Sequence, residues 1–249
     1  MVKWEIGSGI LLLLFSIYIA QLPHYSFFLV MIIGWLFLVD GLHFIHFKES
    51  VLTSSFRKIF IIFVLGGGFL YGGVLEGGNL LAGTLWSYNQ VDVITLFLAH
   101  MFTLPTAFLT FRLLSASLHV EERKKKNYKN KYIPIFIGTL FIFGGAFIPA
   151  PKVITYALFM VGYVLLIEFL VLLRKRHTFI ERLVSNPKLF IPVVMQALLS
   201  GLLVEGANTL AGAWTYHVLT YTIFGLSPFI LVGWIPLIIG LQSLFELVK

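Results

Sequence analysis

Long apolar runs separated by short polar segments occupy almost the whole chain. A helix needs about 20 predominantly apolar residues to cross the ~30 Å hydrocarbon core of a bilayer, and eight runs approach this length. The pattern therefore predicts an all-α, polytopic membrane helix bundle. The expected spans are residues 7–22, 26–47, 58–77, 92–114, 133–149, 153–173, 188–205 and 226–247.

The composition excludes most soluble folds. Of the 249 residues, 59% are apolar and only 12% are charged, whereas about 25% are charged in ordinary globular domains. Too few charged side chains are left to cover a surface that faces water. The chain has 25 Phe and no Cys, which excludes disordered and disulfide-rich classes and leaves no thiolate nucleophile or Cys-ligated metal centre.

The net charge of +7 comes from cations that gather in alternate loops. All 18 Lys and Arg residues except Lys152 lie near the termini or beside the loops that follow the second, fourth and sixth spans. Positively charged loops stay in the cytoplasm, so both termini are expected to be cytoplasmic, in a cell membrane. The basic run 123–131 is interpreted as part of this topology signal rather than as a nucleic-acid site.

The sequence contains an internal repeat. Residues 76–83 match residues 205–212 at six of eight positions, and each copy then continues into Trp-[Ser/Thr]-Tyr. A weaker match at nearly the same offset pairs residues 34–40 with residues 162–168. Two collinear matches indicate two copies of one unit.

Each copy contains four of the expected spans. The first repeat is assigned to residues 1–120 and the second to residues 133–249, with residues 121–132 as a basic cytoplasmic loop between them. An even number of spans gives both copies the same orientation, so the pseudo-twofold axis should run along the membrane normal. Equivalent residues are then expected to face each other across the centre of the bundle.

The repeated motif carries polar residues that are rare in the spans. Glu76 and Glu205 are each followed three positions later by an asparagine, Asn79 or Asn208, on the same helical face. A carboxyl group near an apolar phase tends to keep its proton, and a neutral Glu can donate that proton to an alkene. Neighbouring Trp and Tyr rings could then stabilise the resulting carbocation.

We therefore predict a site in which both glutamates are catalytic. A structural explanation is also open, in which the Glu and Asn side chains clamp the helix ends and the Trp and Tyr side chains form an interfacial belt. The expected substrate-binding residues are Asn79, Asn208, Trp86, Tyr88, Trp214 and Tyr216.

A possible metal site lies near one end of the second span. Asp40, His43 and His46 form a D-x-x-H-x-x-H pattern, which keeps three potential ligands on one broad helical face. The second repeat has no matching ligand set, so we expect no bound metal. His100 and His217 are single histidines and are interpreted as hydrogen-bonded packing residues rather than catalytic bases.

The second motif and the segment after it resemble integral-membrane carotenoid-biosynthesis proteins, which include carotenoid hydratases and share their polytopic character with the lycopene cyclase domain family. The resemblance covers about 30 residues around each copy, and the chain lacks the paired acidic P-x-E-E pattern of lycopene cyclase domains. It implies acid-initiated hydration or cyclisation of an isoprenoid lipid, with Glu76 and Glu205 as proton donor or carbocation stabiliser and no dissociable cofactor. The residues that carry it are Glu205, Gly212, Trp214, Tyr216, Gly225, Pro228 and Trp234.

Three functions remain open from the sequence. The first is an intramembrane enzyme that acts on an isoprenoid or another lipid. The second is a secondary transporter or channel, in which the paired Glu and Asn side chains bind a cation or a proton-coupled solute. The third is a non-catalytic membrane subunit. The expected partners are membrane lipid and a hydrophobic small molecule, with no nucleic acid.

Overall fold

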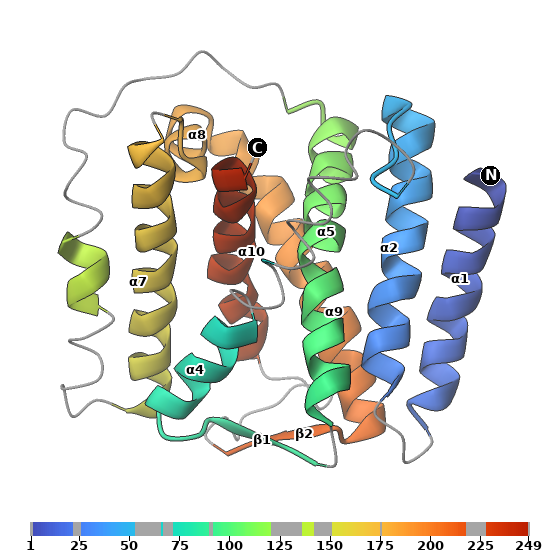
Figure 1. The fold of residues 1–249 in the computed structure, drawn as a ribbon, viewed down its shortest axis with the longest axis horizontal. Helices are drawn as coiled ribbons and strands as arrows, with labels where there is room; N and C mark the ends of the chain where they lie inside the picture. Colours follow the sequence, from blue (N-terminus) through green and yellow to red (C-terminus); the bar gives the residue numbers. More distant parts are fainter. Residues whose placement is uncertain are drawn as a thin grey trace.

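The computed structural model describes residues 2–21, 26–52, 66, 72–89, 92–120, 136–141, 151–174, 176–217 and 228–248, and every structural statement refers to these residues. Most of them are helical, and the long helices run side by side in one layered bundle (Figure 1). The long helices are α1 (Val2–Ile19), α2 (Ser26–Phe47), α5 (Val93–Ser117), α7 (Lys152–Leu173), α9 (Phe190–Ala211) and α10 (Pro228–Val248). The shorter elements are α4 (Gly73–Leu81), β1 (Trp86–Tyr88), α8 (Phe179–Ser185), the 3₁₀ helix η2 (Pro187–Leu189) and β2 (Trp214–Tyr216).

Four of these helices are long and apolar enough to cross a membrane: Ser26–Phe47, Ile94–Ser117, Lys152–Leu173 and Pro187–Ala211. A helical protein with apolar helices of this length is a membrane protein, as the sequence predicts. Large apolar side chains also lie on the outside of the bundle, among them Leu11 on α1 and Ile94 on α5. Lipid chains would cover such a surface.

The remaining expected spans coincide with helices only in part. The spans at 7–22 and 226–247 coincide with α1 and α10, of which α10 contributes a shorter apolar stretch, Gly233–Leu247. Most of the spans at 58–77 and 133–149 lies outside the described residues. The described parts of these two spans are residue 66, residues 72–77 with the beginning of α4, and a helical segment at 136–141.

The helix α9 is longer than the apolar pattern predicts. The expected span ends at residue 205, whereas α9 continues to Ala211. It ends where Gly212 adopts a left-handed backbone conformation, with φ of 60°, and donates its N–H to the Asn208 carbonyl group. Glu205 and Asn208 therefore both lie on the last two turns of a continuous helix.

The helices α1 and α2 approach each other closely at glycines. A Cβ atom on Gly9 would lie 2.5 Å from the Leu38 nitrogen and 2.8 Å from the Gly34 oxygen. At the other side of the molecule, a Cβ atom on Gly138 would lie 2.9 Å from the Gly162 oxygen in α7. Small residues at such contacts allow membrane helices to pack backbone against backbone.

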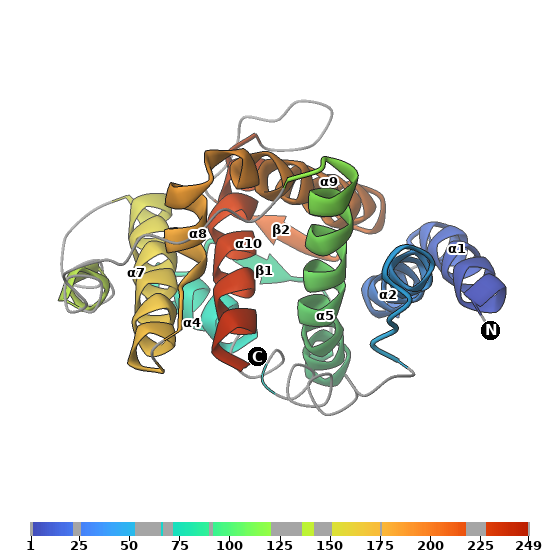
Figure 2. The same ribbon diagram turned by 90° about the horizontal axis from the view of Figure 1, so that it is seen from above.

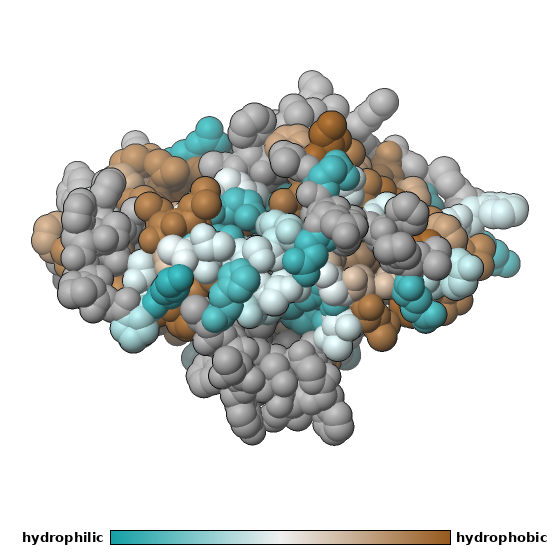
Figure 3. Space-filling view, turned by 90° about the horizontal axis from the view of Figure 1, so that it is seen from below, coloured by the Kyte–Doolittle hydropathy of each residue, from teal (hydrophilic) through white to brown (hydrophobic). Residues whose placement is uncertain are grey.

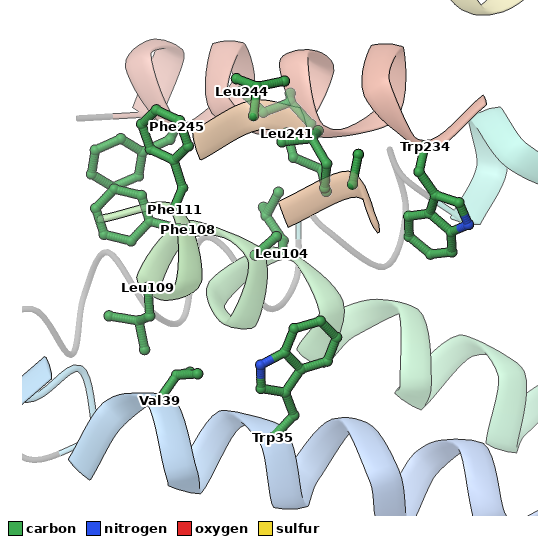
Figure 4. Close-up of a cluster of buried hydrophobic side chains, with 14 of the residues drawn as sticks. Trp35, Val39, Leu104, Phe108, Leu109, Phe111, Trp234, Leu241, Leu244 and Phe245 are labelled. Carbon is green, nitrogen blue, oxygen red and sulfur yellow. The ribbon is translucent and has the colours of Figure 1, made fainter. Parts of the chain in front are cut away.

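The helices α5 and α10 hold the centre of the bundle. Seen from above, α10 lies between α5 and α7, with α2 and then α1 beyond α5 (Figure 2). The helix α9 packs against both α5 and α10. The buried core follows this arrangement, since Trp35 of α2 and Leu104 of α5 face Leu241 of α10, and the Phe108 and Phe245 rings stack with centroids 3.6 Å apart (Figure 4).

A two-stranded ribbon closes one end of the bundle (Figure 1). The strands β1 and β2 pair antiparallel, with Trp86 opposite Tyr216, Ser87 opposite Thr215 and Tyr88 opposite Trp214. Further backbone bonds extend the ribbon on both sides, from the Asn89 nitrogen to the Ala213 oxygen and from the His217 nitrogen to the Leu85 oxygen, each 2.7 Å long. The Trp-[Ser/Thr]-Tyr segments of the two motif copies therefore pair with each other around the central Ser87–Thr215 pair.

The described helix around Glu76 has a different neighbour from the one expected. Equivalent residues of the two copies are expected to face each other across the centre of the bundle, but the described helix α4 packs against α7. Gly78 makes this contact possible, since a Cβ atom there would lie 2.8 Å from Phe159 and 2.9 Å from Tyr156. The two motif copies meet through the ribbon rather than through α4 and α9.

Candidate functional site

A cavity of about 370 Å³ lies inside the bundle next to the ribbon. Side chains from α2, α4, α5, α7, α9 and α10 line it, together with both strands. Most of these side chains are aliphatic or aromatic. The ionisable groups on the lining are Tyr88, His100, Tyr156, Glu205 and Tyr216, and Thr103, Thr106 and Ser200 add hydroxyl groups.

The ribbon presents aromatic rings to this cavity. Alternate side chains of a strand point to opposite faces, and Trp86, Tyr88, Trp214 and Tyr216 all belong to the lining. The rings directly opposite each other on the two strands meet edge to face, with centroids 6.2 Å apart for Trp86 and Tyr216 and 6.4 Å apart for Tyr88 and Trp214. The ribbon thus forms an aromatic wall of the cavity.

The opposite face of the ribbon is polar. His217 Nε2 lies 2.9 Å from Ser87 Oγ, and the Asn89 amide donates to the Gly212 oxygen and to Thr215 Oγ1. From the ribbon end, hydrophilic residues gather across the middle of the molecular surface, with hydrophobic residues toward its margins (Figure 3). The ribbon therefore separates the apolar cavity from a polar outer face.

Glu205 is a buried carboxyl group on the cavity lining, with 7% of the residue exposed. Tyr216 donates its hydroxyl proton to Glu205 Oε1 over 2.9 Å. The Trp214 indole N–H lies 3.3 Å from Glu205 Oε2 and 3.2 Å from the Tyr216 hydroxyl oxygen. Donors from β2 thus fix the orientation of a carboxyl group that α9 carries.

Glu76 has a similar tyrosine partner but a different location. Tyr88 donates its hydroxyl proton to Glu76 Oε1 over 2.6 Å, and His100 Nε2 lies 3.8 Å from the same oxygen. Glu76 keeps 30% of its side chain exposed and is not part of the cavity lining, whereas both of its partners are. Glu76 therefore faces the cavity only through Tyr88 and His100.

The two tyrosines remain proton donors to their glutamates. Burial raises the pKa of Tyr88 far above its ordinary value, and the negative charge of Glu76 raises it further. Burial likewise raises the pKa of Tyr216 well above its ordinary value. Both phenols therefore stay neutral near pH 7, and each presents its proton to a carboxyl oxygen.

The two asparagines hold the ribbon rather than the cavity. The Asn79 amide oxygen accepts from the Leu85 nitrogen (2.7 Å) and the Trp86 nitrogen (3.1 Å), and its amide nitrogen donates to the Trp86 oxygen (3.0 Å). Asn208 forms the corresponding pair of bonds with the Trp214 backbone, 2.9 Å to the nitrogen and 3.0 Å to the oxygen. Neither asparagine belongs to the cavity lining. Each fixes the start of a strand relative to the helix that precedes it.

The predicted residues are therefore divided between two tasks. Glu205 and the four aromatic residues of the ribbon line one cavity, while Glu76, Asn79 and Asn208 lie behind that lining. The lining also contains three residues that the sequence did not single out for chemistry, Trp35, His100 and Tyr156. Trp234 of α10, one of the residues that carry the sequence resemblance, also lies on the lining and interacts with the Glu205 carboxyl group.

The D-x-x-H-x-x-H pattern does not form a metal site. Asp40 is fully buried, and its carboxylate accepts from the Val51 nitrogen over 2.7 Å. His43 Nδ1 lies 2.8 Å from the Glu49 carbonyl oxygen, and His46 is exposed. No group of three or more His, Asp or Glu side chains in the described parts of the chain is arranged to hold a metal ion.

Asp40 instead ties a loop to the end of a helix, and Glu168 does the same in the second copy. Glu168 is buried in α7 and accepts from the Phe179 and Ile180 nitrogens over 3.1 and 3.0 Å. Val51 and Phe179 each follow their carboxylate by eleven residues. The weaker sequence match at 34–40 and 162–168 thus corresponds to a shared structural bond.

Comparisons with protein-family models, with curated proteins and with solved structures found no match. The function is therefore argued from the site. A buried carboxyl group surrounded by aromatic rings can donate a proton into an apolar space, and the rings can stabilise a positive charge that forms there.

Proposed function

We propose that the protein is an intramembrane enzyme that acts on an isoprenoid, or a similar alkene-containing lipid, by acid-catalysed hydration or cyclisation. The observation that carries this proposal is the single buried carboxyl group, Glu205, on the described lining of a mainly apolar cavity. Its position agrees with the role that the resemblance to carotenoid-biosynthesis proteins implies for Glu205, which is that of a proton donor or carbocation stabiliser.

The cavity suits a hydrophobic substrate. Its lining is mainly aliphatic and aromatic, and no Lys or Arg lies on the lining as far as the structure describes it. Small-molecule sites are typically apolar pockets of about 300–1,000 Å³ with a few convergent polar groups. A cavity of about 370 Å³ can enclose one reactive end of a longer lipid chain, and the membrane would supply such a substrate.

The surroundings of Glu205 favour proton donation to carbon. Tyr216 and Trp214 hold this carboxyl group in a fixed orientation on the lining of a mainly apolar cavity. A positioned general acid typically contributes about 10²- to 10⁴-fold in rate. Glu205 is therefore the residue to which we assign the first proton transfer.

The aromatic wall supports the second requirement, which is a stable cationic intermediate. Protonation of an alkene leaves a carbocation, and the π face of Trp or Tyr attracts a cation by about 0.5–2 kcal/mol per ring. Trp86, Trp214 and Trp234 line the same cavity as Glu205. Several such rings together would lower the energy of the cation without supplying a nucleophile.

A transporter or channel remains the alternative for the same paired motifs. It would need polar groups along a path that reaches both membrane surfaces. The described lining carries one carboxyl group and no Lys or Arg, and Glu76 lies outside it. These observations favour the enzyme over a carrier of cations or charged solutes, and a buried cavity with an acid is not needed by a purely structural subunit.

The proposed enzyme consists of two parallel four-helix units with both termini in the cytoplasm of a cell membrane. Three pairs of equivalent contacts support the repeat: the close approaches at Gly9 and Gly138, the carboxylate bonds of Asp40 and Glu168, and the tyrosine bonds of Glu76 and Glu205. The ribbon pairs equivalent segments about one central residue pair. Both chain ends lie at the opposite end of the bundle from the ribbon (Figure 1), in agreement with the charge pattern.

The test is conversion of an acyclic polyene in membranes that contain the protein. Lycopene is a suitable probe because its terminal alkenes are trisubstituted and give tertiary cations on protonation. We expect the wild type to form a hydrated or cyclised product, detected by chromatography and mass spectrometry, and Glu205→Gln to lose it.

Glu49→Gln is the matched control, because Glu49 makes an ion pair with Arg112 outside the cavity. This variant should convert the probe as the wild type does. Equal conversion by wild type and folded Glu205→Gln, or none by the wild type, would contradict the proposed function. Proton or cation flux in proteoliposomes that depends on Glu205 would favour the transporter.

A further inference from the structure

His100 is the only imidazole on the described cavity lining. It lies beside Glu76, which is not part of that lining. The residue is buried, with 6% exposed, and its Nε2 atom lies 3.8 Å from Glu76 Oε1. Its ring meets the edge of Phe28, with centroids 6.4 Å apart. Gly72 leaves room for the imidazole, since a Cβ atom there would lie 3.0 Å from His100 Cδ2.

Glu76 connects this imidazole to the outside of the bundle. Its side chain is 30% exposed, and the same Oε1 atom accepts the Tyr88 hydroxyl proton. Glu76 therefore contacts two cavity-lining groups while part of its side chain stays exposed. A carboxylate next to a histidine can fix the orientation of the ring.

We propose that His100, positioned by Glu76, is the proton acceptor that completes the addition of water to the alkene, opposite the proton donor Glu205. This inference rests on the proposed function, and it commits to hydration, in which the base takes the proton from the added water. The two motif copies then differ in role. Glu205 touches the substrate as a catalytic acid, whereas Glu76 is a positioning residue that acts through His100.

The reaction balances with water as the only co-reactant. The alkene π electrons take the proton of the neutral Glu205 carboxyl group, which forms a C–H bond and leaves a carbocation at the more substituted carbon. A lone pair of the water oxygen then forms the C–O bond, and the oxonium proton passes to neutral His100. The product is an alcohol, and transfer of one proton from the imidazolium back to the Glu205 carboxylate, through water, restores the site.

The location of the pair fits this role. Water must reach the cation without filling the apolar cavity, and a base that borders the exposed Glu76 side can receive it there. The contact of 3.8 Å between His100 and Glu76 is longer than a hydrogen bond, and catalytic contacts in ligand-free enzymes often shorten only when the substrate is bound.

Deuterium incorporation separates the two proton transfers. With lycopene as the probe in D2O, the wild type should form an alcohol that carries one deuterium on carbon. His100→Gln keeps a polar group near Glu76 but cannot accept a proton, so we expect alcohol formation to fall about 10²-fold or more. The cation would then lose a hydrogen from the CHD carbon to the Glu205 carboxylate, and each loss of the original protium leaves deuterium at the alkene carbon of the recovered probe.

Each outcome has a distinct meaning. The assignment of His100 as the proton acceptor is supported if His100→Gln exchanges deuterium into the probe but forms no alcohol, and if Glu205→Gln does neither. The assignment is overturned if His100→Gln forms alcohol at the wild-type rate. It is also overturned if a folded His100→Gln loses both the exchange and the alcohol. Either result leaves the proposed function intact. A wild type that neither deuterates nor hydrates the probe overturns the proposed function as well.

His217→Gln provides the matched histidine control. His217 bonds Ser87 on the polar face of the ribbon and is absent from the described cavity lining. Its replacement should leave the alcohol yield and the deuterium content unchanged. Glu76→Gln should lower alcohol formation and keep the exchange, because it removes the carboxylate that positions His100 and leaves the acid in place.

Discussion

The two copies of the motif build the same scaffold around two different carboxyl groups. In each copy an asparagine holds the start of a strand, and a tyrosine of that strand donates to the glutamate one helical turn before the asparagine. Yet Glu205 is buried on the cavity lining, whereas Glu76 lies behind it and is partly exposed. The two motif copies thus share their hydrogen bonds but differ in the environments of their acids.

Local differences in the chain accompany this separation. The first copy has one more residue before its strand, and Gly83 and Thr84 both take left-handed conformations, with φ of 79° and 63°. The second copy needs only Gly212 there, with φ of 60°. In addition, α4 packs against α7, while α9 packs against α5 and α10. A shared motif therefore does not predict a shared chemical role.

The largest expected effect is a difference in activity between the two glutamates. Glu205→Gln should lower conversion of the probe by about 10²- to 10⁴-fold, because it removes the general acid. Glu76→Gln should lower it by only about tenfold, since the amide oxygen can still accept from Tyr88 while a charge-assisted contact becomes a neutral one. Initial rates of product formation by both variants in the same membranes give the comparison. Equal losses would show that the two carboxyl groups act alike.

The next effect is on stability and concerns the asparagines. Asn79→Ala removes three hydrogen bonds and should cost about 2–4 kcal/mol, whereas Asn208→Ala removes two and should cost about 1–3 kcal/mol. Thermal unfolding in detergent, followed by circular dichroism, measures the difference. Asn89→Ala, on the exposed face of the ribbon, is the control and should change the melting temperature least. A larger loss for Asn208→Ala than for Asn79→Ala would contradict the assigned bonds.

The smallest effect is alkaline destabilisation through the two tyrosines. Burial raises the pKa of Tyr88 and Tyr216 in the folded protein, so their contribution to stability is complete below the unfolded value of about 10 and decreases as the pH rises above it. The melting temperature should therefore fall above about pH 10, and Tyr88→Phe or Tyr216→Phe should reduce that fall. An unchanged alkaline slope in both variants would show that the phenols ionise as freely in the folded protein as in the unfolded chain.

The sequence predicts the membrane class and most of the secondary structure. Apolar runs of sufficient length identify α2, α5, α7 and α9 because the hydrocarbon thickness sets the length of a spanning helix. The repeat also identifies the ribbon aromatics that line the cavity with Glu205. These features depend on composition and local order, which a single sequence contains.

The partners of each residue could not be predicted in the same way. A helix that faces lipid on one side and protein on the other is apolar all round, so the inward positions of Trp35 and His100 leave no periodic signal. The three-residue strands pair across more than a hundred residues of chain, which is a non-local contact. The apolar pattern ends too early at the end of α9 because hydrophobicity declines near Glu205, whereas the helix continues to Ala211 and is capped by Gly212.

The most direct test of the account is a structure of Glu205→Gln with the lycopene probe bound. This variant should retain the substrate because it cannot protonate it. We predict that one end of the polyene occupies the cavity, with its terminal alkene against the residue 205 carboxamide and its chain flanked by Trp214 and Trp234. A cavity that stays free of the polyene, or an alkene that contacts residue 76 instead, would contradict the assignment of Glu205 as the acid.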